Sequence, residues 1–191
     1  MGTRHITAVY VDGAYKVAQY GQLDGYPDGA GLSVLQFART IADKEARKAF
    51  ADKVRACRFI TDEEADELER KYRSGEIKAL DAEYPAFSRN TGDEILGLIS
   101  EHGVRVLHNQ IEFVANGLFC EWVWVIDLDS GRFEGWKGWQ GSPPECEDRW
   151  TFLLDKCEDG YYTPALAGDF PLDDLPTDKE FLDAFKVEEA Q

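Results

Sequence analysis

Residues 19–31 hold the densest group of side chains that could contact a ligand. Amide, phenol and carboxylate groups follow one another in this segment: Gln19, Tyr20, Gln22, Asp24 and Tyr26. Four glycines and one proline between residues 21 and 31 prevent regular structure, so the sequence predicts a shaped loop. A glycine-rich backbone lets a ligand approach closely, and binding sites are often built on such loops. The alternative is a tight connector in which Asp24 forms an Asx turn and Tyr26 packs beneath it.

A second candidate is Glu121, in a strand expected over residues 119–127. Its neighbours in this strand are apolar on both faces, as in the central strand of a sheet. A carboxylate in that setting needs a partner or takes a raised pKa, which would make Glu121 a candidate acid or base. The alternative is that Glu121 reaches water at the start of the strand, or pairs with Arg4 or Arg105. The adjacent Trp122 is a candidate ligand contact.

Aromatic and cationic side chains form two weaker candidates. Four of the five tryptophans lie between residues 122 and 139. Trp136 and Trp139 follow an expected return strand, and partial exposure would make them a stacking surface for a ring-shaped ligand or a partner protein. Core packing is the favoured use of these rings. The basic side chains of a helix expected over residues 43–58 would either hold an anion or form a solvated face.

The sequence lacks the spacing patterns of familiar catalytic and metal sites. It has no Gly-x-Ser-x-Gly, no His-Glu-x-x-His and no Gly-x-x-x-x-Gly-Lys pattern. The four cysteines form no Cys-x-x-Cys pair, and the three histidines are too dispersed to complete a zinc site. We therefore expect no metal and no cofactor, and an enzymatic activity is not indicated.

Local patterns predict the elements that would position the candidate residues. Residues 3–21 are expected to form a β-hairpin around Asp12-Gly13, which is a favoured turn pair. A helix is expected to begin near Leu32. Three Thr-x-x-Glu capping boxes predict further helix starts, at residues 61–64, 91–94 and 177–180. Strands are expected over residues 104–108, 111–115, 119–127 and 132–136.

The order of these elements predicts the fold class. An N-terminal β-hairpin, central helices, a largely antiparallel sheet and a C-terminal helix together make an α+β fold. A length of 191 residues suits one domain over residues 1–191, with 187–191 as a flexible tail. The order of the strands within the sheet does not follow from the sequence.

Composition limits the location of the chain and the class of its partners. The sequence has no apolar run near the roughly 18 residues of a membrane span, and no charged leader before an apolar stretch. We therefore expect a soluble, cytoplasmic protein without a membrane partner. The net charge of −16 repels nucleic-acid phosphates, so direct nucleic-acid binding is not expected. An acidic decoy that imitates nucleic acid is the converse possibility.

Two stretches of the sequence are similar to known sequences. Residues 17–29, VAQYGQLDGYPDG, and residues 119–129, FCEWVWVIDLD, resemble a group of uncharacterised proteins found in phages, bacteria and fungi. That resemblance implies no activity, but it includes both candidate sites. A hairpin followed by a loop, helices and strands is also similar to the layout of N-terminal-nucleophile hydrolases. Their first residue is a nucleophile whose own amine acts as base, and only Thr3 could take that role here, after processing.

Three functional hypotheses follow from the sequence. The first is a non-enzymatic binding protein that uses loop 19–31, beside Glu121 and Trp122, for a small molecule or a protein partner. A phage-type origin, implied by the resemblance alone, would make that partner a host protein. The second is a hydrolase with Thr3 as its nucleophile. The third is the acidic decoy.

Overall fold

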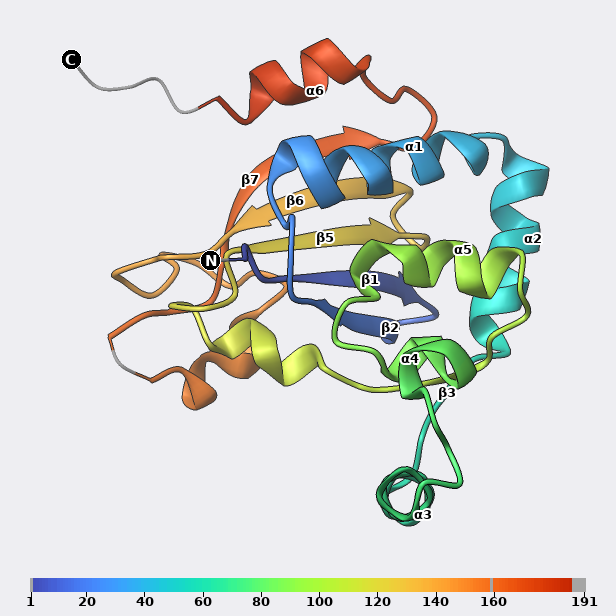
Figure 1. Cartoon of the computed structure of the whole chain (residues 1–191). Coiled ribbons are helices and arrows are strands. Elements are labelled where there is room, and N and C mark those ends of the chain that lie inside the picture. The colour runs from blue at the N-terminus through green and yellow to red at the C-terminus, as the bar shows by residue number, and fades with distance from the viewer. Residues whose placement is uncertain (1, 159, 187–191) are drawn as a thin grey trace.

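The computed structural model describes residues 2–158 and 160–186, and the tail expected over residues 187–191 lies outside them. A five-stranded sheet forms the centre of the fold, with the strand order β2-β1-β5-β6-β7 (Figure 1). Its strands are β1 (His5–Val11), β2 (Ala14–Gly21), β5 (Trp122–Asp127), β6 (Arg132–Lys137) and β7 (Ala165–Pro171). Two short parallel strands, β3 (Arg58–Phe59) and β4 (Val106–Leu107), form a second sheet.

The pairing within the large sheet confirms the α+β fold class. β1 and β2 form the expected antiparallel hairpin, and the β5–β6 and β6–β7 pairs are also antiparallel. β1 and β5 are parallel, so the sheet is mixed. The hairpin turn has positive φ angles of 53° at Asp12 and 73° at Gly13, as a type I′ turn requires. Both turn N–H groups donate to the carboxylate of Asp129, at 2.9 and 2.8 Å.

Helices cover both faces of the large sheet. One face packs against α1 (Leu32–Thr40), α2 (Lys44–Arg55), α5 (Ile95–Ser100) and α6 (Asp178–Ala184). The opposite face packs against two 3₁₀ helices, η4 (Ile111–Ala115) and η5 (Thr151–Lys156). Each face therefore has its own hydrophobic core, and the central strand β5 is buried along its whole length. Within the described residues, every helix is too short or too polar to cross a membrane.

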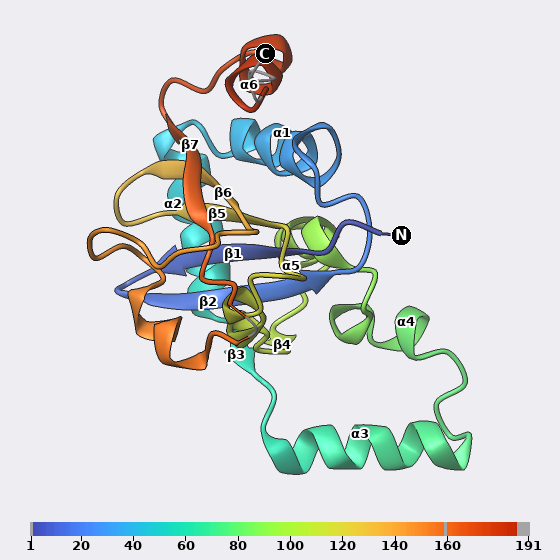
Figure 2. The same cartoon turned by 90° about the vertical axis from the view of Figure 1, so that its left-hand side faces the viewer.

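Residues 62–74 form a helix that does not pack on the sheet (Figure 2). α3 (Asp62–Ser74) begins with the expected capping box of Thr61 and Glu64 and ends at Gly75, whose φ is 80°. It stands away from the rest of the chain, as Figure 2 shows. The short helices α4 (Leu80–Glu83) and η2 (Pro85–Phe87) then lead back to the sheet.

Two of the predicted elements are wrong. Residues 111–115 form a helix instead of a strand, because Ile111, Val114 and Ala115 are buried at helical spacing against the sheet. Thr91 does not cap a helix: its backbone is already helical, and its hydroxyl donates to the carbonyl of Pro85. A 3₁₀ turn, η3 (Gly92–Glu94), therefore precedes α5.

Candidate functional site

Both predicted stretches meet at one end of the large sheet, around His5. His5 is the first residue of β1, and its Cα pairs with Gly21 at the end of β2 and with Trp122 at the start of β5. The loop that follows β2 and the segment that precedes β5 therefore flank this histidine. His5 is not among the site residues predicted from the sequence.

Three glycines enclose the imidazole of His5. A Cβ atom at Gly21, Gly25 or Gly92 would lie 2.2, 2.8 and 2.8 Å, respectively, from an atom of the histidine side chain. Such distances exclude any side chain at these positions, so the backbone of three chain segments closes over the ring. His5 is accordingly only 1% exposed.

Buried polar atoms without a hydrogen-bond partner gather at this end of the sheet. Among the described residues six such side-chain atoms occur, and four of them belong to His5 (Nδ1 and Nε2), Thr7 (Oγ1) and Gln19 (Oε1). Thr7 pairs with Gln19 across the hairpin, and His5 lies two residues before Thr7, so the three side chains share one face of the sheet. An unpaired buried polar group costs about 1–3 kcal/mol, so such a cluster points to a bound partner.

Asp93 connects the buried cluster to the surface. Its Oδ1 lies 3.8 Å from Nε2 of His5, too far for a hydrogen bond, and its side chain is 22% exposed. Burial lowers the pKa of His5, although the negative charge of Asp93, the backbone carbonyl of Thr3 and the negative charge of Asp24 oppose that effect. The imidazole is therefore neutral near pH 7, with one nitrogen as donor and the other as acceptor.

A surface groove of about 360 Å³ lies on the other side of Asp93, between α1 and α5. Its walls combine apolar and acidic side chains with two small polar groups: Ser33, Phe37, Asp93, Glu94, Leu96, Leu98 and His102. The groove can therefore take a ligand that has an apolar part and a group attracted to carboxylates. Asp93 is the residue that both the groove and the buried cluster share.

Three of the predicted site residues fasten the loop to its surroundings. Nε2 of Gln19 donates to the carbonyl oxygens of Tyr20, at 3.2 Å, and of Ser88, at 3.4 Å. The hydroxyl of Tyr20 donates to Oε1 of Gln22 at 2.6 Å, and Arg89 donates to the same oxygen. These contacts tie the end of β2 to the segment before η3, which carries Asp93.

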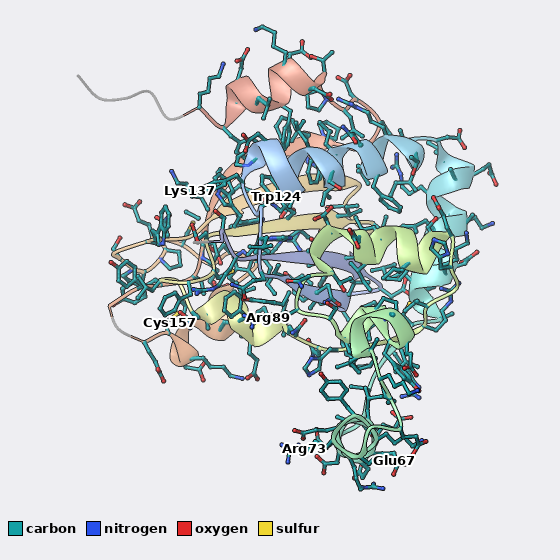
Figure 3. The ribbon with its side chains drawn as sticks, in the orientation of Figure 1. Glu67, Arg73, Arg89, Trp124, Lys137 and Cys157 are labelled. Carbon is teal, nitrogen blue, oxygen red and sulfur yellow. The ribbon has the colours of Figure 1, made fainter. Side chains whose placement is uncertain are left out.

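The other predicted loop residues lie at the surface. Asp24 is exposed and has a positive φ of 54°, and its carbonyl accepts a hydrogen bond from the N–H of Ala30 at 2.7 Å. Tyr26 is 48% exposed, and does not pack beneath the loop. The loop backbone is instead held by Trp124, whose Nε1 donates to the carbonyl of Gly25 at 3.0 Å. Trp124 lies between the sheet and α1 (Figure 3).

Trp122 and Glu121 occupy different environments. Trp122 is buried and stacks on Trp124 with a ring-centroid distance of 5.2 Å, and Trp124 in turn contacts the loop at Gly25. Glu121 precedes β5 and is partly exposed, and its backbone N–H donates to the carbonyl of Arg4 at 3.0 Å. Arg105, the other predicted partner, donates to the carbonyls of Ile99 and Val104.

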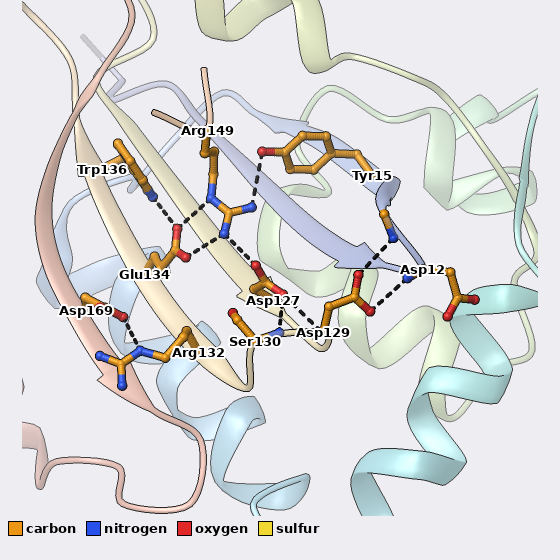
Figure 4. A network of polar contacts seen from close by, with 11 residues as sticks. Asp12, Tyr15, Asp127, Asp129, Ser130, Arg132, Glu134, Trp136, Arg149 and Asp169 are labelled. Atoms are coloured by element: carbon orange, nitrogen blue, oxygen red, sulfur yellow. Dashed lines mark hydrogen bonds and ion pairs between the residues drawn. The ribbon is translucent and has the colours of Figure 1, made fainter. Parts of the chain in front are cut away.

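A second buried polar cluster, centred on Arg149, lies on the opposite face of the sheet (Figure 4). Its guanidinium donates to Asp127 and to Glu134, each at 2.7 Å, and to the hydroxyl of Tyr15 at 3.3 Å. Trp136 is buried, as core packing of this ring implies, and its Nε1 donates to Glu134 at 2.7 Å. No sequence pattern predicts this cluster, because its members are distant along the chain.

The two clusters differ in how far their polar atoms are satisfied. Burial raises the pKa of Asp127, but hydrogen bonds from Ser130 and Arg149 outweigh burial and leave the pKa below its usual value. The Arg149 cluster is thus internally paired and needs no ligand. The His5 cluster is the one with unpaired atoms, so we take it, with the adjoining groove, as the candidate site.

The described residues contain no group of three or more His, Cys, Asp or Glu side chains arranged to hold a metal ion. The only sequence signal for the site was the glycine spacing of the loop, because the enclosure of His5 depends on Gly92, far along the chain. Comparison of the chain with family models, with curated proteins and with solved structures found no match.

Proposed function

We propose that the protein binds a small organic cation in the groove between α1 and α5, above the His5 cluster. The observation that carries this proposal is the position of Asp93, which lines the groove and lies 3.8 Å from a buried, unpaired imidazole nitrogen. Loop 22–31 and segment 88–94 enclose the cluster from two sides. A ligand there would contact the candidate region predicted from the sequence.

The donors and acceptors of the site favour a ligand that donates hydrogen bonds. The amide nitrogen of Gln19 already donates to two carbonyls, and its unpaired oxygen can only accept. Asp93 and Glu94 add two carboxylates at the groove. An ammonium or amidinium group suits the two carboxylates that line the groove, and hydrogen bonds to charged groups are the strong ones.

The apolar walls of the groove specify the rest of the ligand. Phe37, Leu96 and Leu98 line the space beside the carboxylates, so an alkyl or aryl body on the cationic group would be removed from water. The net charge of −16 also raises the local concentration of cations. The proposal is a binding function, because no hydrogen bond joins the hydroxyl of Thr7 to His5 to activate it as a nucleophile.

A calorimetric titration tests the proposal, with n-butylammonium as the probe and n-butanol as its uncharged counterpart. We expect the wild type to bind n-butylammonium more tightly than n-butanol, and Asp93→Asn to weaken amine binding by roughly tenfold or more. Glu45→Gln, an exposed carboxylate on α2, is the matched control and should bind as the wild type does. Equal binding of amine and alcohol, or unchanged binding in Asp93→Asn, would contradict the proposal.

A protein partner remains the second candidate, favoured by the exposed tip of the same loop. Leu23 and Tyr26 are 54% and 48% exposed, and exposed aromatic anchors are typical of protein interfaces. Under this alternative, Leu23→Ser/Tyr26→Ser abolishes co-purification of one defined host protein, whereas Asp93→Asn does not. The small-cation proposal predicts the opposite pattern for n-butylammonium binding, so the two sets of variants separate the candidates.

A further inference from the structure

Asp93 is the charged residue with the largest electrostatic effect on the buried ring of His5. Its Oδ1 lies 3.8 Å from Nε2, and its negative charge favours the protonated imidazole. The backbone carbonyl of Thr3 and the negative charge of Asp24, in the loop after β2, act in the same direction but more weakly. The protonation state of His5 is therefore coupled most strongly to a carboxylate that also lines the groove.

The other elements next to His5 bring uncharged or already paired groups. β2 and β5 contribute Gly21 and Trp122 as its register partners, and neither residue titrates. Arg89, in the segment before η3, donates to a side-chain amide oxygen of the loop. Among the described residues, a proton on His5 therefore has the carboxylate of Asp93 as its main counter-charge.

The distance between Asp93 and His5 leaves room for a closer ion pair. Charge-assisted hydrogen bonds are about 2.7–2.9 Å long, so the carboxylate would move by about 1 Å to accept the proton of an imidazolium Nε2. The glycine backbone encloses the ring, so this movement belongs to Asp93. Since the groove lies on the other side of Asp93, the movement withdraws the carboxylate from a ligand in the groove.

A cation in the groove and a proton on His5 would share this one carboxylate. A proton on His5 places a positive charge behind Asp93 and cancels the attraction that the cation experiences. A bound cation in turn disfavours a second positive charge on the imidazole, because like charges at short range repel. Thermodynamic linkage makes the two effects equal in free energy.

We propose that His5 is a proton switch for the groove between α1 and α5: proton uptake by its imidazole and binding of the cation at Asp93 oppose one another. This inference rests on the proposed cation binding and adds its regulation. In the exchange, His5 takes up one proton for each cation released. Burial places the pKa of His5 below its ordinary value of 6.5. The site therefore binds its cation at neutral pH and releases it in the acidic range where His5 becomes protonated.

Calorimetric titrations with n-butylammonium between about pH 7.5 and about pH 4.5 test the switch, because an alkylammonium stays charged over this range. We expect the affinity of the wild type to fall by roughly tenfold as His5 is protonated. His5→Gln should keep its affinity until the carboxylates titrate near about pH 4. His102 is a second, exposed histidine of the groove, and His102→Gln should still lose affinity at low pH, which excludes His102 as the source.

An imidazole NMR titration gives a second readout that needs no substitution of His5. Saturating n-butylammonium should lower the pKa of His5 in the wild type by about 1, the counterpart of a tenfold change in affinity. In Asp93→Asn the same addition should leave the pKa of His5 unchanged. Without ligand, Asp93→Asn should itself lower the pKa of His5, because it removes the charge that favours the imidazolium.

The outcomes separate the switch from the binding function on which it rests. If the wild type binds n-butylammonium at about pH 7.5 but His5→Gln loses affinity at low pH as the wild type does, the switch is overturned and cation binding stands. A pKa of His5 that saturating n-butylammonium leaves unchanged has the same meaning. A wild type that does not bind n-butylammonium at about pH 7.5 overturns both proposals.

Discussion

At the scale of single residues, the two clusters of buried polar groups differ in how completely they are hydrogen-bonded. Arg149 is bonded to two carboxylates and a phenol, whereas His5, Thr7 and Gln19 retain unpaired atoms. Removing a member from the first set leaves an uncompensated buried charge. Changing a member of the second set removes polar atoms that have no hydrogen-bond partner, so no buried charge is left behind. The two sets should therefore respond differently to mutation.

Arg149→Ala should destabilise the protein by about 3–5 kcal/mol, because Asp127 and Glu134 would remain buried without their counter-charge. Urea unfolding followed by tryptophan fluorescence measures this loss. Arg132→Ala is the matched control: Arg132 pairs with Asp169 on the more exposed edge of the sheet, and its loss should cost about 1 kcal/mol or less. Similar losses of unfolding free energy in both variants would show that the buried ion pairs of Arg149 contribute no more than the exposed pair of Arg132.

His5 should make stability depend on pH in the mildly acidic range. Burial lowers its pKa below the 6.5 of the unfolded chain, so the unfolded state binds a proton that the folded state does not. The free energy of unfolding should therefore fall as the pH drops below about 6.5 towards the lowered folded pKa. Urea titrations at several pH values measure the slope. His5→Gln should reduce that slope, and an imidazole NMR titration should find His5 still neutral at pH 6.5.

At the scale of elements, the site depends on how closely η3 approaches β1. Gly92 has a positive φ of 46°, and a Cβ on it would lie 2.8 Å from Nε2 of His5. The hydrogen bonds of Gln19 and Gln22 hold the same segment against β2. The orientation of Asp93 towards His5 is thus a consequence of backbone contacts on both sides of it.

Gly92→Ala should lower the thermal unfolding temperature and weaken n-butylammonium binding together, since it strains the backbone and pushes η3 away from His5. Gly97→Ala is a control for stability alone, because Gly97 also lines the groove. Gly97 lies in α5 with open space around its Cα, so alanine there should raise stability by about 0.5–1 kcal/mol. Calorimetric unfolding of both variants gives the comparison, and a stabilised Gly92→Ala would contradict the enclosure of His5.

Prediction from the sequence succeeded where structure is set by neighbouring residues. The hairpin at Asp12-Gly13, the helix from Leu32 and the capping box at Thr61 are all local patterns, and all are present. β7 was not predicted, because as an edge strand it is mostly exposed and lacks apolar alternation. The partners of His5 and Arg149 were not predicted either, since each contact depends on the order of the strands.

At the scale of the whole molecule, electrostatic repulsion is the dominant long-range force. A net charge of −16 on 191 residues favours the expanded chain, and most of the ion pairs are at the surface, where each contributes little. The unfolding temperature should therefore rise as sodium chloride is added from low ionic strength to about 0.1 M, where charges beyond roughly 10 Å are screened. A fall over this range would mean that surface ion pairs outweigh the repulsion.

The parallel pairing of β1 with β5 has a consequence for how the protein is made. Tyr10 pairs with Asp127, so more than half of the chain must leave the ribosome before the first strand meets its central neighbour. Until then the β1–β2 hairpin has an open edge and two uncovered faces, and hairpins of this kind are marginal alone. Contacts of such sequence separation fold slowly. The interval between the synthesis of the hairpin and that of β5 is therefore when the nascent chain is most exposed to aggregation.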